Sequence, residues 1–451
     1  MIAIEKLQIF KFNKDKSPFI VFCIFFIIPT LMSLFAWMIF NARGIGDGSG
    51  NSFMLLFDSK HLFTDWLLAK AWSSVRNPWE YIGSVFEDKL PVCFYGPSIF
   101  MFLKMLPGKA DLNPYEVMIH VSTVFLIIFV GWICLLKASS FITGGLDEIS
   151  TILSIIILAF SFPIFFAVNR GNTAIISYLF LTLFLYFCIC KFSSYIWIVF
   201  LNLYAFSSFQ LLPIFAISIL CFFTLKTFKP KFLVIISTTP ILAYILYTGI
   251  NLETLWTTYN ISAQLVGGWG GVYNHDFVSG LKIINFNPFL SSIFILFSIS
   301  IPIYLLLIFL RKNKNNKNSI EIYKLFKQIF QLEKSYNVVF LVFSWSALSL
   351  VISSPSADYH LLRIIPFIYL ALHLALNQKN GKDKISDVIL FLNVASGAVV
   401  ISYMKIWDIF RFIDIVDMAV PLRSINLIIW VSTMFYVFLS WHRNKLDLKE
   451  V

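Results

Sequence analysis

Long apolar stretches separated by short polar segments dominate this chain of 451 residues. Stretches of about 15 to 23 residues match the roughly 20 residues with which an α-helix crosses the hydrocarbon core of a bilayer. Twelve can be placed, so the pattern predicts an all-α polytopic membrane protein whose residues 1–451 form a single transmembrane domain. The predicted spans are 18–40, 117–136, 149–168, 174–191, 195–209, 211–225, 232–249, 288–310, 338–352, 361–376, 387–403 and 423–441.

The division between the fifth and sixth spans is the least regular part of this pattern. A single helix over 195–225 would be about 47 Å long, against a hydrocarbon core of about 30 Å. Ser207, Ser208 and Gln210 interrupt its middle, and Pro213 follows, which removes a helical hydrogen bond. We therefore expect a break here and two short spans.

Composition supports a membrane location. Hydrophobic residues make up 59% of the chain and charged residues only 13%, with a mean hydropathy of +0.81. Because soluble domains carry about 25% charged residues, these values exclude an ordinary soluble globule. The first stretch, 18–40, is too long for the core of a signal peptide, so we expect it to be retained. Five of the six cysteines lie in or beside apolar stretches, so no disulfide framework is expected, and Cys188 and Cys190 are interpreted as packing residues.

The net charge of +11 is unevenly distributed along the chain. When spans are numbered from the amino terminus, the first side carries 22 Lys and Arg and 10 Asp and Glu. The other side carries 13 Lys and Arg and 14 Asp and Glu. The positive-inside rule then places the first side, with both termini, in the cytoplasm. The basic surplus follows membrane topology, so we expect no nucleic-acid partner.

Four segments between the spans have patterns of their own. The first outer loop, 41–116, is rich in aromatic residues, and we expect part of it to be helical. The second outer loop is 250–287. A basic cytoplasmic loop, 311–336, contains a predicted interfacial helix, and 405–418 has a similar amphipathic pattern on the outer side.

Five short polar motifs interrupt the apolar pattern, and the first surrounds Asp65. A partly desolvated carboxylate at the membrane interface suits a general base, although Asp65 could instead cap a helix or form an ion pair. Trp79 and Tyr95 follow in the same loop as candidates for contact with a sugar or an acceptor.

The second and third motifs are tight connections between spans. Asn169-Arg170-Gly171-Asn172 places Arg170 at the outer lipid boundary, where it either anchors the helix or binds an anion. Ser207 to Pro213, which includes Gln210, is either a simple kink or part of a ligand site.

The fourth motif lies in the second outer loop, where Asn274 and His275 stand among several aromatic residues. Such a loop could bind a sugar or a lipid headgroup, or form an aromatic belt at the interface.

The fifth motif, 353–363, begins the span at 361–376. Asp358, Tyr359, His360 and Arg363 fall within six residues, and the last three lie within about one helical turn, so they could face one ligand. Asp358 could equally cap the following helix. All five motifs fall on the predicted outer side, which is the layout of an active site at a membrane surface.

The order of these motifs resembles that of the polyprenyl-phosphate-sugar-dependent glycosyltransferases of the GT-C superfamily, and most closely glycosyltransferase family 87. That family has an early Asp, then Asn-Pro-Tyr, Tyr-Pro-Pro, Arg-Gly-Asn, Ser-x-Lys-x-x-Pro, Asn-His and Ser-Pro-Ser-x-Asp-Tyr. The similarity covers about residues 20 to 375. The matching segments are Asp65, Asn77-Pro78-Trp79, Tyr95-Gly96-Pro97, Arg170-Gly171-Asn172, Ser208 to Pro213, Asn274-His275 and Ser354 to Tyr359.

Two departures from the family pattern stand out. Gln210 replaces the usual Lys, which removes a possible phosphate cation, and Gly96 replaces a Pro.

The resemblance implies an inverting glycosyltransferase of the bacterial inner membrane that needs no cofactor. A sugar would pass from a polyprenyl-phosphate donor to an envelope glycan or glycolipid acceptor at the outer face. Asp65 would be the general base, while Arg170, His275, Arg363 and Gln210 would contact the donor phosphate or headgroup. Acceptor or sugar contacts would fall to Asn172, Asn274, Asp358, Tyr359, His360, Trp79 and Tyr95. No carboxylate pair has a spacing that favours a metal site.

Two other classes of membrane protein compete with this interpretation. A transporter or lipid flippase would also have about twelve spans, but transporters place ionisable or helix-breaking residues near the middle of the bilayer. An O-antigen polymerase or ligase would carry an Arg-rich outer loop late in the chain, where the loops of this protein are short.

Overall fold

A computed structural model of the chain describes residues 63–79, 95–107, 114–145, 171–250, 334–352, 358–377 and 416–447, parts of 161–168 and 292–304, and single positions at 253, 332 and 392. Within these parts the regular elements are helices, and an isolated antiparallel bridge joins Tyr95 to Ser208. The predicted all-α class is therefore confirmed for the described residues.

The helices follow the predicted spans, with shifted ends. The first outer loop contains α3 (Thr64–Ser74) and α4 (Pro97–Met105), so it is partly helical as predicted. The remaining elements are α5 (Pro114–Thr143), α8 (Ala174–Cys190), η3 (Phe192–Ser194), α9 (Trp197–Ala205), η4 (Phe209–Ile214), α10 (Phe215–Thr224), α11 (Phe228–Thr248), α16 (Ser335–Ile352), η5 (Asp358–Arg363), α17 (Ile365–Asn377) and α20 (Val416–Asp447).

Two helices in the described part are long and apolar enough to cross a membrane, namely Tyr115–Thr143 and Phe228–Thr248. Shorter apolar helices include Ala174–Cys190, Ser335–Val351 and Ser424–Ser440. These helices support membrane association. The total of twelve spans stays a prediction, because 18–40, nearly all of 149–168 and 387–403, and much of 288–310 lie outside the described residues.

The two long helices expose apolar faces. On α5, Met118, Phe125 and Phe129 are more than half exposed. On α11, Phe228 and Leu246 are each more than three-quarters exposed. Residues three, four or seven apart share one face of a helix, so these side chains form stripes that suit contact with lipid.

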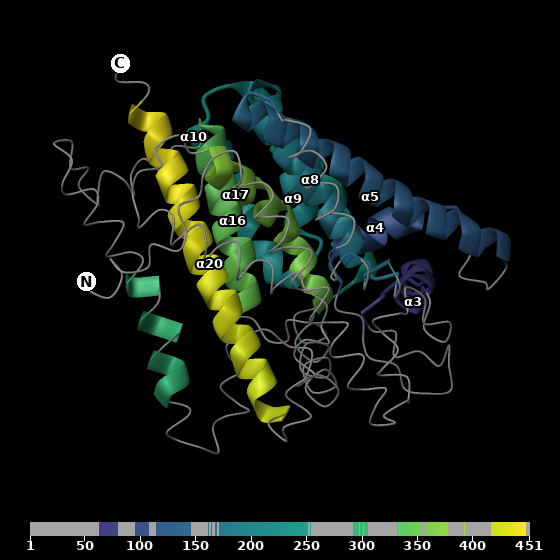
Figure 1. The fold of residues 1–451 in the computed structure, drawn as a ribbon. Coiled ribbons are helices and arrows are strands. Elements are labelled where there is room, and N and C mark those ends of the chain that lie inside the picture. The colour runs from purple at the N-terminus through teal and green to yellow at the C-terminus, as the bar shows by residue number, and fades with distance from the viewer. Residues whose placement is uncertain are drawn as a thin grey trace, which may run out of the picture.

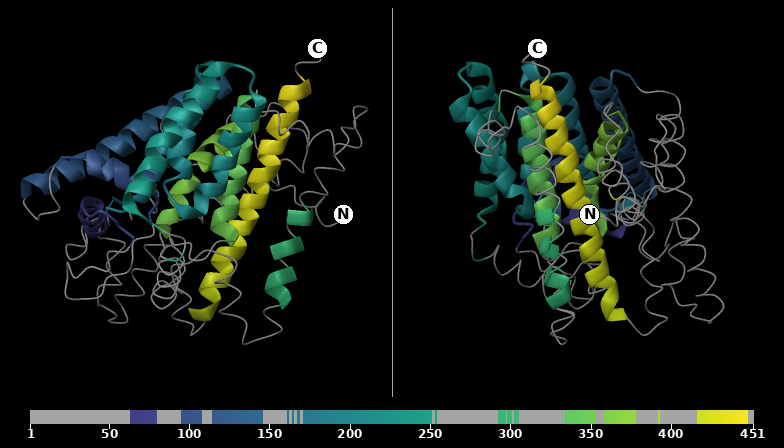
Figure 2. Two further views of the ribbon diagram at one scale, coloured as in Figure 1. Left: turned by 180° about the vertical axis from the view of Figure 1, so that it is seen from behind. Right: turned by 60° about the vertical axis from the view of Figure 1, so that its left-hand side comes forward.

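The helices lie side by side as a bundle, with α20 on one side and α5 on the other (Figures 1 and 2). Trp66 of α3 contacts both His120, near the start of α5, and Gly171, just before α8. At the other end, the Cys190 thiol contacts the Lys137 carbonyl oxygen at 3.7 Å. The helices α5 and α8 therefore run parallel, and their starts define what we call the lower end of the bundle, as drawn in Figure 1.

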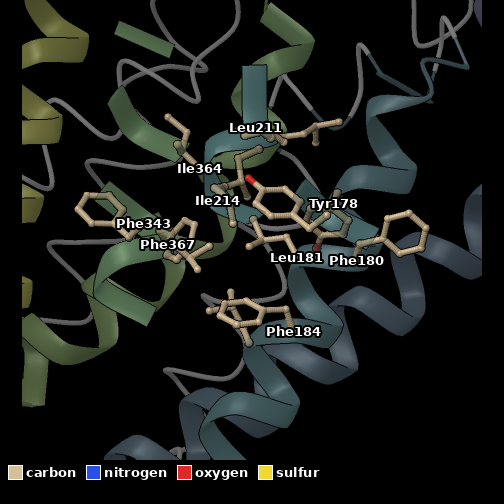
Figure 3. Packing of buried hydrophobic residues seen from close by; sticks show 14 of the residues in the cluster. Tyr178, Phe180, Leu181, Phe184, Leu211, Ile214, Phe343, Ile364 and Phe367 are labelled. Carbon is tan, nitrogen blue, oxygen red and sulfur yellow. The ribbon is translucent and has the colours of Figure 1, made fainter. Parts of the chain in front are cut away.

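Aromatic and aliphatic side chains from four elements fill the interior (Figure 3). Phe184 and Leu181 of α8 are buried together with Phe343 of α16 and Phe367 of α17. The Phe343 and Phe367 ring centroids are 5.4 Å apart. This packing joins α8 to the pair α16 and α17, and it fixes the positions of the polar segments at their lower ends.

The expected break within 195–225 is present. The helix α9 ends at Ala205, and η4 contains Pro213, whose missing N–H disfavours a continuous helix. Since α9 has 9 residues and α10 has 10, neither exceeds about 15 Å in length, well short of a hydrocarbon core of about 30 Å. Whether this segment makes one crossing or two stays a prediction.

Near the carboxyl end the helix boundary differs from the prediction. The helix α20 begins at Val416, seven residues before the predicted start at 423, so the end of the amphipathic segment 405–418 belongs to this helix. Its carboxyl end lies at the upper end of the bundle (Figure 1). The interfacial helix predicted at 320–334 and nearly all of the loops 250–287 and 311–336 lie outside the described residues.

Candidate functional site

Asp65 and Asn172 form a polar contact at the lower end of the bundle. The Asn172 Nδ2 atom donates to Asp65 Oδ2 at 3.0 Å and lies 3.5 Å from the Tyr95 hydroxyl. The Asn172 Oδ1 atom accepts from the Ala174 N–H at 2.9 Å, which fixes the orientation of the amide, since a backbone N–H can only donate. Asn172 is only 1% exposed, so it holds the Asp65 carboxylate from a rigid position at the start of α8.

Gly171 allows α3 to come close to α8. Its φ of +61° lies in the left-handed region, which glycine adopts without steric cost. A Cβ atom at this position would lie 2.9 Å from the Phe63 Cα and the Trp66 Cβ, both fixed by α3. The tight turn predicted from Gly171 and Asn172 is therefore the place where α3 comes closest to α8, and this approach brings Asp65 to Asn172.

A second backbone contact links Tyr95 to the break after α9. Gly96 N–H donates to the Ser207 carbonyl oxygen at 3.0 Å, and Ser98 N–H donates to that of Phe206 at 3.2 Å. The Ser98 hydroxyl also donates to the Leu203 carbonyl oxygen at 2.7 Å. Two motifs separated by more than a hundred residues thus lie in direct contact.

Gln210 and Arg363 form a further polar pair. Arg363 Nη1 donates to Gln210 Oε1 at 2.6 Å, and the Trp345 indole N–H donates to the Gln210 carbonyl oxygen at 3.0 Å. Arg363 is only 3% exposed, and its helix η5 packs against α8. Arg363 therefore lies in the interior of the bundle, whereas Gln210 is half-buried.

Gln210 lies between the buried Arg363 and the partly exposed Trp345. Its partner Trp345 lies seven residues before the end of α16 at Ile352, which is about 10 Å along the helix axis. The sequence pattern alone places the break in the chain but not its depth.

Both departures from the family pattern have a structural reason. A Cβ atom on Gly96 would lie 2.1 Å from the Phe206 carbonyl oxygen, and a proline there would also lack the N–H that bonds Ser207. The Gln210 side chain supplies the oxygen that accepts from Arg363. A lysine at 210 would instead bring a second cation against the guanidinium.

Trp79, which we predict to contact a sugar or an acceptor, is buried against its neighbours in the structure. Its side chain is 1% exposed, and its indole N–H donates to the Tyr95 carbonyl oxygen at 3.0 Å. Its ring packs edge-on against Phe100, with centroids 5.4 Å apart. These contacts favour a structural role that supports the Tyr95 segment.

Several predicted site residues are not placed beside this cluster. Arg170, Asn274 and His275 lie outside the described residues. Asp358 and Tyr359 belong to η5, whose backbone is described, but their side chains are outside the described set. His360, in the same helix, is half-buried. The structure thus brings together Asp65, Asn172, Tyr95, Gln210 and Arg363 through direct contacts and the Tyr95 to Ser208 bridge.

The structure contains buried polar side chains near Asp65 that the sequence pattern does not predict, namely His120 and Lys70. The Trp66 indole N–H donates to His120 Nδ1 at 3.1 Å, and His120 is fully buried. Lys70, only 4% exposed, donates to the carbonyl oxygens of Leu103 and Leu106, both at 2.7 Å. The signal in the sequence is weak, since it consists of single polar residues in apolar segments.

Lys70 connects α3 to the carboxyl end of α4. Burial lowers the pKa of its ammonium group, and the nearby Glu116 carboxylate partly opposes this shift. An ammonium group at a helix carboxyl end satisfies carbonyl oxygens that have no partner within the helix. Lys70 thereby fixes α4, which begins next to Tyr95.

The cluster offers the groups needed for acid–base chemistry and anion binding. It contains a carboxylate oriented by an amide, a phenol, and a guanidinium paired with a neutral amide. Among the described residues, no group of three or more His, Cys, Asp or Glu side chains could hold a metal ion. The thiols of Cys188 and Cys190 contact the carbonyl oxygens of Ser335 and Lys137, which are packing contacts with different helices.

Comparison of the chain with protein-family models, curated proteins and solved structures found no match.

Proposed function

We propose that the protein is a membrane-embedded glycosyltransferase that uses a polyprenyl-phosphate sugar. The observation that carries the proposal is a contact network that begins at Asp65, at the lower end of the bundle, and continues to the pair of Gln210 and Arg363. It joins Asp65, Asn172 and Tyr95 to the segment that contains Gln210 and its partner Arg363. Four motifs that are far apart in the chain thus supply a carboxylate and a cation to one connected network.

In the proposed reaction, Asp65 accepts the proton of an acceptor hydroxyl. The hydroxyl oxygen attacks the anomeric carbon of the donor sugar, and the bond from that carbon to the phosphate oxygen breaks. The electron pair of this bond leaves with the phosphate, which gives free polyprenyl phosphate and a sugar of inverted configuration. Asn172 orients the base, and a positioned base of this kind accelerates proton transfer by about 10² to 10⁴ fold.

The leaving phosphate needs positive charge, and Arg363 is the buried cation of the described cluster. A guanidinium can stabilise a developing phosphate charge without a metal ion. The contact with Gln210 holds Arg363 in place without neutralising it, because the amide is uncharged. Arg170 and His275 remain proposed partners of the same phosphate.

The carrier lipid would enter from the bilayer at the outer face. The exposed apolar faces of α5 and α11 support the membrane location. The upper end of α8, where Lys191 is exposed, carries the basic residues that predict the cytoplasmic side. We propose that the lower end, with the Asp65 cluster, faces away from the cytoplasm of a bacterial inner membrane, and that both termini are cytoplasmic.

The test is transfer of radiolabelled sugar from polyprenyl-phosphate donors to envelope glycolipids by purified protein in vesicles. We expect Asp65→Asn to reduce the rate at least 100-fold, because the general base is lost. The matched control is Glu253→Gln, which removes an exposed carboxylate and should leave the rate unchanged. Undiminished transfer by Asp65→Asn would remove Asp65 from the base role.

A transporter or flippase is the second candidate, because one observation favours it. The pair α9 and α10 is interrupted by η4, and discontinuous helices with an internal charge are typical of transport sites. The contact of the buried Arg363 with Gln210 lies at this interruption. Movement of labelled lipid across the vesicle membrane without transfer of its sugar would support transport and contradict the enzymatic proposal.

A further inference from the structure

Two cations meet one aromatic ring at the lower end of α11. The Arg76 guanidinium carbon lies 5.9 Å from the Tyr247 ring centroid, and Lys104 Nζ lies 5.3 Å from the same centroid. Arg76 Nε also donates to the Tyr247 carbonyl oxygen at 3.4 Å. All three side chains are exposed, with Tyr247 at 54%. We call these three residues the basic rim.

The position of the basic rim along α11 matches the level of lipid headgroups. At the opposite end of the helix, Lys231 Nζ lies 5.9 Å from the Phe222 ring centroid. Sixteen residues separate Lys231 from Tyr247, which corresponds to about 24 Å along the axis. Most of the exposed apolar side chains of α11, from Phe232 to Leu246, lie between these two groups. A tyrosine with basic neighbours at the end of such a face is typical of the membrane interface, where headgroups lie.

The charge of the basic rim fits an anion. Neither Arg76 nor Lys104 forms an ion pair with a carboxylate in the part of the chain that the structure describes. A guanidinium binds phosphate through paired N–H groups, and an ammonium adds a second positive charge. A lipid phosphate is the anion that occurs at this level of a bilayer.

We propose that Arg76, Lys104 and Tyr247 bind the phosphate headgroup of an anionic glycerophospholipid, whose acyl chains lie along the exposed face of α11. This inference does not depend on the enzymatic proposal. The basic rim is separated from the Asp65 cluster by the length of α4, whose 9 residues extend about 13 Å from the Tyr95 side to the Lys104 side. A lipid bound there is tested as a separate ligand from the donor by competition with polyprenyl phosphate.

The experiment counts lipids retained by the purified full-length protein in native mass spectrometry. The protein in neutral detergent is titrated with phosphatidylglycerol and, separately, with phosphatidylcholine. A cation at a membrane surface contributes about fivefold to binding of an anionic lipid, so Arg76→Gln with Lys104→Gln should weaken retention of phosphatidylglycerol about 25-fold. Lys191→Gln is the control, because it removes an exposed cation from the opposite end of the bundle. It should leave retention of phosphatidylglycerol at the basic rim unchanged.

A second variant keeps the test independent of folding. Tyr247→Leu retains the apolar surface but removes the ring, and we expect a smaller loss of phosphatidylglycerol binding with an unchanged helical signal in circular dichroism. Equal retention of phosphatidylglycerol by the wild type and the double variant would overturn the proposal. The proposal would also be overturned if the wild type bound phosphatidylcholine as strongly as phosphatidylglycerol. Displacement of phosphatidylglycerol by equimolar polyprenyl phosphate would overturn it too.

Discussion

The substitution Gly96→Ala tests the contact between the Tyr95 segment and the break after α9. The φ of Gly96 is −78°, which alanine adopts freely, so the effect must come from the added Cβ atom. That atom would lie 2.1 Å from the Phe206 carbonyl oxygen and 2.7 Å from the Ser207 carbonyl carbon. Both are backbone atoms, so the two segments must separate by about 1 Å to reach van der Waals contact.

Separation weakens two hydrogen bonds, from Gly96 N–H to Ser207 and from Ser98 N–H to Phe206. Each contributes about 1 kcal/mol net, and overpacking costs about 1 to 3 kcal/mol. We therefore expect Gly96→Ala to lower the free energy of unfolding by about 2 to 4 kcal/mol, measured by denaturant titration in mixed micelles with tryptophan fluorescence.

Gly249→Ala is the control for this measurement. Gly249 has a φ of +68°, in the left-handed region. A Cβ atom there would meet nothing within 4 Å. The cost is therefore only that of the left-handed backbone, about 1 kcal/mol. A loss for Gly96→Ala no larger than that for Gly249→Ala would refute the close contact.

Two further predictions concern polar groups near the site. Gln210→Lys should destabilise the protein by about 2 kcal/mol or more in the same titration, because it removes an acceptor from buried Arg363 and adds a like charge. Gln210→Met, which only removes the acceptor, should cost less, and the reverse order would contradict the contact. The lowered pKa of Lys70 means that the folded state binds this proton less tightly than the unfolded state, so its contribution to stability should rise as pH increases toward the ordinary value of 10.5. The difference in unfolding free energy between the wild type and Lys70→Met should therefore grow between pH 8 and pH 10, and a constant or falling difference would contradict a buried ammonium.

Much of the helical architecture follows from local sequence. Apolar length predicts the described helices that match the expected spans, such as α5, α8 and α11, and Pro213 with its polar neighbours predicts the break that follows α9. The same local information places Asp65, Asn172 and Arg363 near the ends of helices. These features depend on residues close together in the chain, which is why composition and periodicity reveal them.

The contacts between distant segments could not be predicted in this way. The Tyr95 to Ser208 bridge joins residues from two separate parts of the chain, and its close approach depends on the single hydrogen side chain of Gly96. The depth of Gln210 is set by its contact with Trp345 of α16. Lys70 is buried because the end of α4 offers two carbonyl oxygens, which a single lysine in an apolar segment does not indicate.

The most direct test of the central claim is photocrosslinking of a donor lipid to the Asp65 cluster. A benzophenone amino acid replaces Tyr95, and the same replacement at Phe141, which is exposed near the carboxyl end of α5, serves as the control. The donor is a polyprenyl-phosphate sugar labelled in its headgroup. We expect labelling at 95 that excess unlabelled polyprenyl phosphate abolishes and phosphatidylglycerol does not change. Labelling at 141 should be insensitive to both lipids. Absence of labelling at 95, or labelling there that neither lipid changes, would contradict a donor site at this cluster.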